Sequence, residues 1–330
     1  MKIIFTTQLP HEGFQLLSNT PGVQLIMPEQ ERLDIPSFIQ SAHTDAEILV
    51  ATFDYTVSKE LIDSMPNLQL ITNFGVGYNN IDLDACRARG IRVTNTPQPV
   101  IEPTAELAFA LMHDVARRTA EFDRKLREGK AEPFGVMNNL SHSLYSKTLG
   151  IIGMGRIGQA LARRAVASGM NIIYHNRRPL SDEDLRRLGY EARYMSKEEL
   201  LETADFVSLN LPYTPEVKHI IDGKALRMMK PTAYLINTAR GSLIDEDALV
   251  AHMLAGNLKY ACLDVTDPEP PTADSPLRSV PNIIMTPHLA GLAQNGLRRI
   301  GSHVADEIEK FLAGKPMLAE VTQDMLAKMA

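Results

Sequence analysis

Short apolar runs alternate with longer amphipathic stretches along most of the chain. Runs rich in β-branched residues and bounded by turn residues predict strands, whereas stretches with apolar residues three or four positions apart predict helices. The first series of predicted strands comprises residues 2–6, 23–26, 48–51, 70–74 and 92–94. A second series comprises residues 148–153, 171–174, 206–209, 233–238, 260–264 and 283–285. This alternation predicts an α/β protein with two parallel sheets.

Between the two series lies a predicted helix that would connect the sheets. Leu107, Leu111 and Val115 recur at intervals of four residues, so they fall on one helical face. We expect Thr104 to cap the N-terminus of this helix and Gly129 to end it. A second amphipathic helix is predicted near the end of the chain from the positions of Ile300, Val304, Ile308 and Phe311.

The composition limits the kinds of partner that the protein can have. The 330 residues carry 34 Lys and Arg against 40 Asp and Glu, a net charge of −6 without long runs of like charge, so we expect no nucleic-acid or membrane partner. Cys86 and Cys262 are far apart and predict neither a disulfide framework nor a metal site. No apolar run approaches the ~20 residues of a membrane span, and the N-terminal run is too short for a signal peptide. We expect a cytoplasmic protein whose partner is a small molecule.

A glycine-rich turn follows the first strand of the second series. Gly153, Gly155 and Gly158 form the pattern G-x-G-x-x-G directly after an apolar strand and directly before a helix-compatible stretch. Glycines permit a tight turn and close approach of a pyrophosphate, and the N–H groups at the start of a helix attract phosphate. We therefore predict a dinucleotide site that includes Arg156 and Ile157, in preference to an ordinary glycine-rich turn.

The end of the next strand indicates which dinucleotide binds. Eighteen residues after Gly158, where a carboxylate would bind the ribose hydroxyls of NAD, stands Asn176, followed by Arg177 and Arg178. Guanidinium groups match the geometry of a 2′-phosphate. The sequence therefore favours NADP as the cofactor, with NAD as the second choice. The alternative is that both arginines only solvate a surface loop.

Three ionisable residues follow later strands, where open α/β sheets bind their ligands. They are Arg240 in "LINTARGSLID", Glu269 in "LDVTDPEPP" and His288 in "IIMTPHLAG". An arginine can hold a carboxylate and polarise a keto oxygen, a histidine can donate a proton, and a carboxylate can orient the imidazole, which together suffice to reduce a 2-keto acid. Taken singly, each has a structural alternative: a capped turn for His288, a solvated loop charge for Glu269, and an ion pair with Asp245 for Arg240.

Seven motifs resemble those of the D-isomer-specific 2-hydroxyacid dehydrogenase family, in the family's order and close to its spacing. They are "FGVGYNNID", "NTPQPVIEPTAELAFAL", "LGIIGMGRIGQALA", "NLPYTPEVKHII", "LINTARGSLID", "LDVTDPEP" and "TPHLAG", and they span nearly the whole chain. The resemblance implies a catalytic set of Arg240, Glu269 and His288. It also implies that Gly75, Val76 and Gly77 present backbone N–H groups to the substrate carboxylate, and that Arg240 and His288 contact the substrate as well.

The resemblance also assigns further positions to the cofactor site. Val100 and Thr104 match positions near the nicotinamide, and Asp264 matches one that binds the nicotinamide carboxamide. Leu211 and Pro212 match positions near the adenosine. The remaining implied cofactor contacts are Thr238, Ala239, Arg240, His288 and Gly291.

The domain organisation follows from the same resemblance. It implies two doubly wound parallel-sheet domains: a Rossmann cofactor domain of residues 99–289, inserted into a flavodoxin-like substrate domain of residues 1–98 and 290–330. The chain would cross between them twice, forming a hinge whose closure excludes water from the path of the hydride. Family members are usually dimers through the cofactor domain, so we expect a homodimer in which the helix from Thr104 makes the contact.

Two departures from the family pattern narrow the expected function. Asn210 replaces a histidine common in the family, and the chain has no tryptophan. Together with "HNRR", Asn210 resembles the glyoxylate and hydroxypyruvate reductase branch. We expect NAD(P)H-dependent reduction of glyoxylate or hydroxypyruvate to the 2-hydroxy acid, in the D configuration when the product is chiral, with the proton from His288. The alternatives are a dehydrogenase for a bulkier or phosphorylated 2-hydroxy acid, and a dinucleotide-sensing scaffold of the corepressor type.

Overall fold

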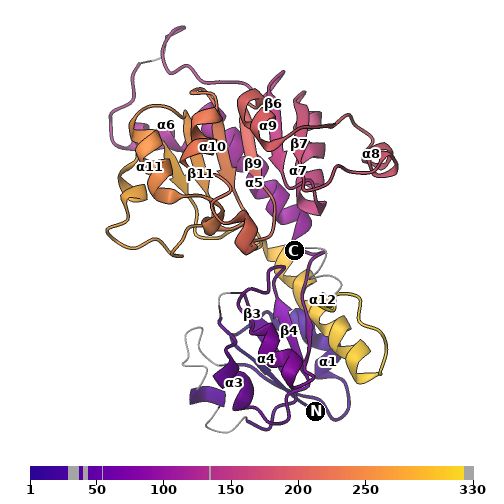
Figure 1. The fold of residues 1–330 in the computed structure, drawn as a ribbon. Helices are drawn as coiled ribbons and strands as arrows, with labels where there is room; N and C mark the ends of the chain where they lie inside the picture. The colour runs from indigo at the N-terminus through magenta and orange to yellow at the C-terminus, as the bar shows by residue number, and fades with distance from the viewer. Residues whose placement is uncertain (29–36, 40–43, 54, 134, 323–330) are drawn as a thin grey trace. The chain divides into compact units, whose positions relative to one another are not determined.

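The protein consists of two compact units that interrupt one another in the sequence. A computed structural model describes residues 1–28, 37–39, 44–53, 55–133 and 135–322. The first unit contains Met1–Val100 and Gly291–Ala330, and the second contains Ile101–Ala290. In Figure 1 the indigo and purple strands near the N-terminus therefore share a unit with the yellow helix near the C-terminus.

The first unit is built on a five-stranded parallel sheet with the strand order β2-β1-β3-β4-β5. This is the flavodoxin-like order. Its strands are β1 (Lys2–Phe5), β2 (Gln24–Ile26), β3 (Ile48–Thr52), β4 (Leu70–Phe74) and β5 (Arg92–Thr94). Its helices are η1 (His11–Phe14), α1 (Gln15–Ser18), α3 (Lys59–Asp63), α4 (Leu83–Ala88) and α12 (Gln294–Leu312).

Alternate strand residues of the first unit point to opposite faces of the sheet, and each face has its own core. One core joins Ile4 and Leu49 to Ile62 of α3. The other joins Ile3 and Phe5 to the apolar side of α12, which consists of Ile300, Val304, Ile308 and the half-buried Phe311. The amphipathic helix predicted at the end of the chain is therefore confirmed.

The second unit is built on a seven-stranded parallel sheet with the order β12-β11-β10-β9-β6-β7-β8. Strand order reverses between β6 and β9, which creates the crevice where doubly wound sheets bind dinucleotides. Its strands are β6 (Thr148–Ile152), β7 (Asn171–His175), β8 (Arg193–Tyr194), β9 (Phe206–Leu209), β10 (Tyr234–Asn237), β11 (Tyr260–Leu263) and β12 (Ile283–Met285). The predicted α/β class with two parallel sheets is confirmed.

Helices cover both faces of the seven-stranded sheet. They are α5 (Ile101–Arg117), α6 (Thr119–Arg127), α7 (Arg156–Ala167), α8 (Asp182–Leu188), α9 (Lys197–Thr203), α10 (Gly223–Met228) and α11 (Glu246–Leu254), with short 3-10 turns η2 (Pro215–Val217), η3 (Gly241–Leu243) and η4 (Pro276–Ser279). Leu111 of α5 and Leu161 of α7 share one core, whereas Leu200 of α9 and Leu226 of α10 share the other. No helix in the described part of the chain is long and apolar enough to cross a membrane.

The structure corrects the predicted connecting helix in two respects. The helix begins at Ile101, so Thr104 lies inside its first turn and does not cap it. The helix also ends at Arg117, because Arg118 has a left-handed φ of 59° and separates α5 from α6. Gly129, with a φ of 68°, follows the end of α6 as expected.

Candidate active site

Three adjacent strands bring the predicted ionisable residues to one edge of the seven-stranded sheet. Arg240 follows β10, Glu269 follows β11 and His288 follows β12, and these strands are neighbours in the sheet. Because all three strands are parallel, the loops at their carboxyl ends leave the same edge. The second unit therefore collects an arginine, a carboxylate and a histidine from segments spread over about fifty residues of sequence.

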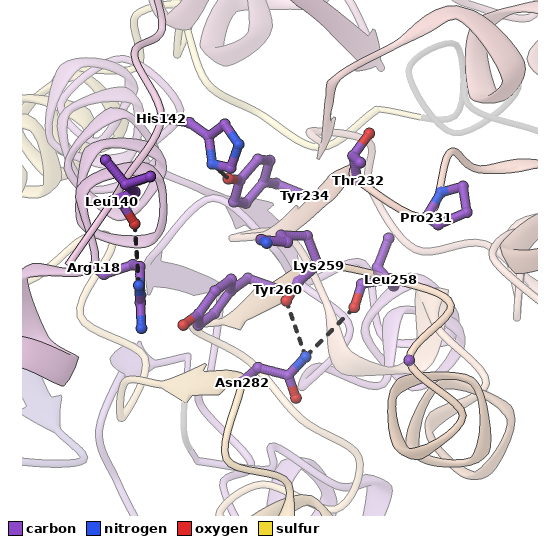
Figure 2. A pocket seen from close by; sticks show the side chains of 11 residues that line it. Arg118, Leu140, His142, Pro231, Thr232, Tyr234, Leu258, Lys259, Tyr260 and Asn282 are labelled. Carbon is purple, nitrogen blue, oxygen red and sulfur yellow. Dashed lines mark hydrogen bonds between the residues drawn. The ribbon is translucent and has the colours of Figure 1, made fainter. Parts of the chain in front are cut away.

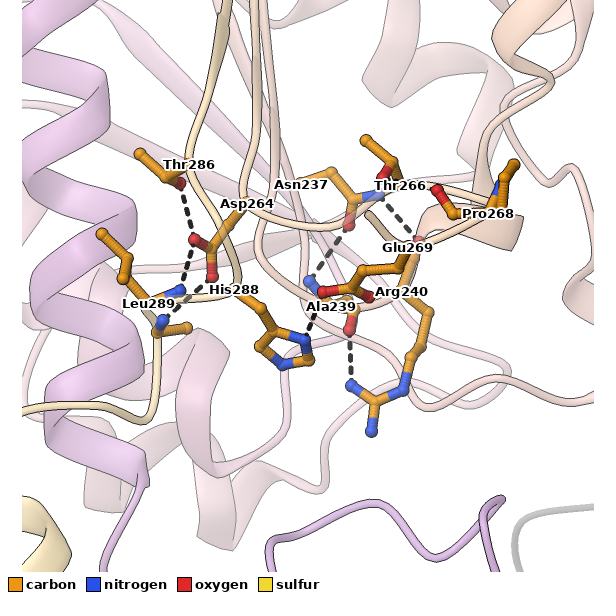
Figure 3. A network of polar contacts seen from close by, with 11 residues as sticks. Asn237, Ala239, Arg240, Asp264, Thr266, Pro268, Glu269, Thr286, His288 and Leu289 are labelled. Carbon is orange, nitrogen blue, oxygen red and sulfur yellow. Dashed lines mark hydrogen bonds and ion pairs between the residues drawn. The ribbon is translucent and has the colours of Figure 1, made fainter. Parts of the chain in front are cut away.

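His288 and Glu269 form a direct pair (Figure 3). Their Nδ1 and Oε1 atoms are 2.7 Å apart, and their side chains are 26% and 37% exposed. An ionised carboxylate can only accept hydrogen bonds, so the Nδ1 of His288 carries the donated hydrogen. This arrangement orients the ring and leaves Nε2 as its reactive nitrogen. The solvated-loop alternative for Glu269 is therefore not what the structure shows.

Asp264 fixes the backbone turn that carries His288. Its buried carboxylate accepts hydrogen bonds from the Thr286 hydroxyl at 2.6 Å and from the N–H groups of Leu289 and Ala290 at 2.8 and 2.9 Å. The N–H of His288 donates to the Asp264 carbonyl at 2.9 Å, and His288 has a φ of 53°. Burial raises the pKa of Asp264, against the effect of these hydrogen bonds. Both carboxylate oxygens of Asp264, the residue expected to bind the nicotinamide carboxamide, thus already hold the loop that carries His288.

A buried asparagine closes the turn that carries Arg240. The amide nitrogen of Asn237 donates to the Arg240 carbonyl at 2.8 Å, and its amide oxygen accepts from the Ala239 N–H at 3.0 Å. The guanidinium of Arg240 donates to the Ala239 carbonyl at 2.6 Å. Burial lowers the pKa of Arg240, and the nearby Glu269 carboxylate opposes that effect. Asp245, the alternative partner for Arg240, instead caps α11 through the N–H of Ala248.

The loops that carry Arg240 and Glu269 interlock at Gly241. A Cβ atom on Gly241 would lie 2.1 Å from the carbonyl carbon of Thr266 and 2.3 Å from its oxygen, so only glycine fits. The Thr266 hydroxyl donates to the Pro268 carbonyl at 2.8 Å, and the Asp267 N–H donates to Glu246 at 2.8 Å. These backbone contacts fix the positions of the two loops relative to one another.

The glycine-rich turn has the shape that a dinucleotide requires. It links β6 to α7, whose first residues are Arg156 and Ile157. A Cβ on Gly158 would lie 2.4 Å from the Gly153 carbonyl, so the third glycine permits close packing of helix on strand. A Cβ on Gly155 would meet nothing within 4 Å, so the backbone there is open to a pyrophosphate. These residues fit a dinucleotide.

The loop after β7 carries the three residues expected to select the cofactor. Asn176 accepts the N–H of Met154 on its amide oxygen at 2.6 Å, and its carbonyl accepts the Tyr194 hydroxyl at 3.3 Å. Asn176 therefore ties the end of β7 to the glycine-rich turn, a contact that its position in the sequence did not predict. Arg177 and Arg178 are exposed beyond it.

The segment after β9 lies directly beside the glycine-rich turn. A Cβ on Gly153 would lie 2.7 Å from the carbonyl carbon of Asn210 and 2.8 Å from the nitrogen of Leu211. Leu211 and Pro212 thus follow β9 at the edge of the crevice between β6 and β9. This is where the resemblance implied contacts with the adenosine.

The remaining expected cofactor residues are placed in both units. In the second unit, Thr238 is buried beside Ala239 after β10, and the buried hydroxyl of Thr104 lies 3.5 Å from the Ala290 carbonyl. In the first unit, Val100 is buried in the core that also contains α12, and a Cβ on Gly291 would lie 3.9 Å from it.

The loop of residues 75–77 in the first unit directly follows β4. The N–H of Gly75 donates to the Asn73 carbonyl at 2.9 Å, so it is already engaged. Val76 and Gly77 are half-buried, and the expected role as donors to a carboxylate therefore narrows to these two residues.

A cavity of about 480 Å³ opens at the opposite, amino edge of the seven-stranded sheet (Figure 2). Its lining includes Tyr234 and Tyr260, the first residues of β10 and β11, and Asn282, which precedes β12. Tyr234 Oη lies 3.0 Å from Nδ1 of His142, and burial together with nearby cations lowers the pKa of this histidine. The cavity is separate from the edge that carries Arg240 and His288, and the sequence did not predict it.

Comparisons with known proteins agree with this geometry. The family described as "D-isomer specific 2-hydroxyacid dehydrogenase, NAD binding domain" matches residues 109–290. A glyoxylate reductase of Korarchaeum cryptofilum is 37% identical over 316 residues, which cover 95% of this chain and 93% of that protein.

Two solved structures are similar over nearly their whole length. The TT0316 protein from Thermus thermophilus is 36% identical with a TM-score of 0.89, covering 98% of this chain and 100% of that chain. A glyoxylate reductase from Paecilomyes thermophila is 31% identical with a TM-score of 0.85, covering 98% of this chain and 99% of that chain. The family expected from the sequence motifs is confirmed. The chain is an oxidoreductase with a nicotinamide-dinucleotide-binding domain, and it belongs to the D-isomer-specific 2-hydroxyacid dehydrogenase family.

Proposed function

We propose that the protein reduces a small 2-keto acid, glyoxylate or hydroxypyruvate, to the 2-hydroxy acid, which has the D configuration where it is chiral, with NADPH as the preferred cofactor. The observation that carries the proposal is the 2.7 Å pair of His288 and Glu269 beside Arg240 at the carboxyl edge of the seven-stranded sheet. The names of the similar glyoxylate reductases support the choice of substrate.

His288 is the proton donor in this proposal. Glu269 holds Nδ1 and stabilises the positive charge of the protonated ring, so Nε2 can deliver its proton to the keto oxygen. Imidazole is the side chain best suited to proton transfer near neutral pH. The nicotinamide, when bound, supplies the hydride that the keto carbon accepts. After proton transfer the neutral ring remains oriented by Glu269.

Arg240 and the N–H groups of Val76 and Gly77 bind the substrate carboxylate in this proposal. A guanidinium keeps its charge even where burial lowers its pKa, as at Arg240. It can therefore hold the carboxylate and polarise the adjacent keto oxygen throughout the reaction. The interlocked loops at Gly241 would keep Arg240 and Glu269 in register, which favours reaction in one geometry.

The preference for NADPH rests on the loop after β7. The position where a carboxylate would bind the ribose hydroxyls of NAD is held by Asn176, whose amide oxygen is occupied by the Met154 N–H. The exposed Arg177 and Arg178 add positive charge there, which suits a 2′-phosphate. Because Asn176 is uncharged, it does not repel that phosphate as a carboxylate at this position would.

The test is the initial rate of glyoxylate and hydroxypyruvate reduction, with NADPH and with NADH at the same concentrations. We expect turnover with at least one of the two keto acids and a higher kcat/KM with NADPH. Equal rates with both cofactors, or an advantage for NADH, would refute the proposed role of Arg177 and Arg178. No rate with either keto acid would refute the substrate and redirect the assay to bulkier or phosphorylated 2-keto acids.

A homodimer formed through the second unit completes the proposal. Large apolar side chains lie in water on α6 and the segment that follows it, namely Leu126, Val136, Met137, Leu140 and Tyr145. Several large exposed apolar side chains on neighbouring segments of the chain are typical of a protein interface, and we infer that a second copy covers them. Light scattering after gel filtration should give twice the chain mass, and Val136→Glu with Met137→Glu should give the monomer. A monomeric wild-type protein would refute the homodimer.

A further inference from the structure

We propose that two buried asparagines, Asn73 and Asn95, are positioning residues for substrate recognition. They hold the loop of residues 75–77 so that its carbonyl groups face the interior of the first unit while the N–H groups of Val76 and Gly77 remain available to a carboxylate. This inference rests on the proposed function, in which that loop binds the substrate carboxylate.

Every carbonyl oxygen of the loop accepts a hydrogen bond from within the first unit. The donors are the Thr96 N–H to Gly75 at 3.0 Å, the Asn95 amide to Val76 at 2.7 Å, and the Asn73 amide to Gly77. Two of the three donors are side chains, and both asparagines are buried, with exposed fractions of 0% and 3%. The Asn95 amide therefore orients the peptide group that carries the Gly77 N–H, and the Asn73 amide fixes the following peptide group at the end of the loop.

The N–H groups of the loop show the opposite pattern. Gly75 donates to the Asn73 carbonyl, whereas within the described residues no hydrogen bond is formed by the N–H of Val76 or Gly77. The N–H groups of Val76 and Gly77 share peptide groups with the carbonyls of Gly75 and Val76, which are held by the Thr96 N–H and the Asn95 amide. Two successive peptide groups whose carbonyls are held in this way present their N–H groups on the other side, which is the geometry of a backbone anion site. Asn95 thus orients the Gly77 N–H, and Asn73 anchors the end of the loop that carries it, without either side chain touching the substrate.

A third asparagine determines which way the Asn73 amide points. Asn80 donates to the Asn73 amide oxygen at 3.1 Å, and also to the carbonyls of Thr52 and Tyr55 at 3.0 Å each. Since the amide oxygen of Asn73 is engaged as an acceptor, its nitrogen must face Gly77. This chain of contacts connects the ends of β3 and β4 to the recognition loop.

Removal of either amide should reduce the fraction of molecules in which the loop is ready to bind. Apparent affinity falls in proportion to that fraction, so the loss appears in the KM of the keto acid. One net hydrogen bond corresponds to a change of about five- to tenfold. The dinucleotide site lies in the other unit, so the KM for NADPH should be unaffected.

The experiment compares Asn73→Ala and Asn95→Ala with Asn282→Ala. Asn282 is a matched control, because its amide also donates to two backbone carbonyls, those of Leu258 and Lys259, but at the amino edge of the second unit. For the first two variants we expect the glyoxylate KM and the inhibition constant of oxamate to rise about five- to tenfold, while the KM for NADPH changes less than about twofold. Asn282→Ala should leave all three constants unchanged.

Unchanged constants for glyoxylate and oxamate in both Asn73→Ala and Asn95→Ala would overturn the inference, as would a parallel rise in the KM for NADPH. If the alanine variants do not fold, Asn73→Ser and Asn95→Ser replace them, because serine keeps a polar group too short to reach the loop. A wild-type protein that binds oxamate without reducing glyoxylate would refute the proposed substrate, and the oxamate constants would still decide the inference. A wild-type protein that binds no oxamate would overturn the inference itself.

Discussion

The two edges of the seven-stranded sheet are held in place by different kinds of contact. At the carboxyl edge, backbone packs against backbone at Gly241 and Thr266, and the carboxylate of Asp264 binds two backbone N–H groups. At the amino edge, side chains hold side chains, as where Glu121 accepts from Arg118 and from Tyr260. The backbone contacts therefore keep a few groups of the carboxyl edge in one geometry. At the amino edge, a side-chain contact can be removed by the substitution of one residue.

Replacement of the histidine at the carboxyl edge should have the largest effect on activity. His288→Ala removes the proposed proton donor and should lower kcat by about 10²- to 10⁴-fold, far more than it weakens the binding of NADPH. Steady-state kinetics and cofactor titration by fluorescence measure the two quantities. His142→Ala, at the amino edge, is the matched control and should retain the wild-type kcat. Equal turnover in His288→Ala would remove His288 from the role of acid.

Gly241→Ala tests whether the backbone packing at the carboxyl edge excludes every residue larger than glycine at position 241. The added methyl group would overlap the Thr266 carbonyl, so we expect a loss of about 2–3 kcal/mol in the free energy of unfolding and a fall in kcat. Urea denaturation gives the first quantity. Gly223→Ala is the control, because its Cβ would meet only ordinary contacts at 3.4 and 3.7 Å. Wild-type stability in Gly241→Ala would contradict the interlocked geometry.

The cofactor loop lies at the same carboxyl edge but is exposed, so its replacement should affect binding and not stability. Arg177→Ala with Arg178→Ala should raise the KM for NADPH about tenfold and barely change that for NADH, since only NADPH has a 2′-phosphate. Arg186→Ala with Arg187→Ala, on the neighbouring helix α8, provides the control with the same loss of charge. An unchanged KM for NADPH would assign both arginines to the solvated surface.

A change at the amino edge should give the smallest effect, and one that depends on pH. Arg118, followed by Lys125 and Tyr260, lowers the pKa of Glu121 well below its usual 4.5, against the effect of burial. A lowered carboxyl pKa stabilises the folded protein in full above pH ~4.5, and this stabilisation is lost progressively as the pH falls from that value towards the lowered pKa of the folded protein.

Glu121→Gln should therefore lower the free energy of unfolding by about 1–2 kcal/mol at pH 7 and by less at pH 3, where part of the stabilisation is already lost. Urea denaturation at the two pH values provides the comparison. Glu128→Gln, whose ion pair with Lys130 is exposed, should have little effect at either pH. A difference for Glu121→Gln that is as large at pH 3 as at pH 7 would show that packing, and not charge, accounts for the loss.

The sequence predicts the sheets well because buried parallel strands are short, nearly continuous apolar runs. Each of the eleven predicted strands ends within one residue of its observed bounds. The strand that was missed, β8, has only Arg193 and Tyr194, and both are exposed, so no apolar pattern marks it. The break between α5 and α6 was missed because Arg118 is held in its left-handed conformation by distant contacts, including the Leu140 carbonyl at 3.1 Å.

The chemistry of the site was predictable from residue types at strand ends. The residues that hold the catalytic loops in place were not predictable. Arg240, Glu269 and His288 carry charge or titrate, so they stand out in a motif. Asn237 has neither property, and its contacts with Ala239 and Arg240 become visible only once the turn is folded. The same holds for Asp264, whose three donors come from a loop more than twenty residues later in the chain.

The split of the first unit across both ends of the chain has a consequence for biosynthesis. Residues of β1 and η1 such as Phe5 and Phe14 leave the ribosome first, yet Ile300 and Val304 of α12, which share their core, are made only after the whole second unit. Domains fold as units, so the second unit can fold before α12 has been synthesised. Until then, one face of the sheet of the first unit is not covered by α12. The first part of the protein to be synthesised is therefore the last to become native.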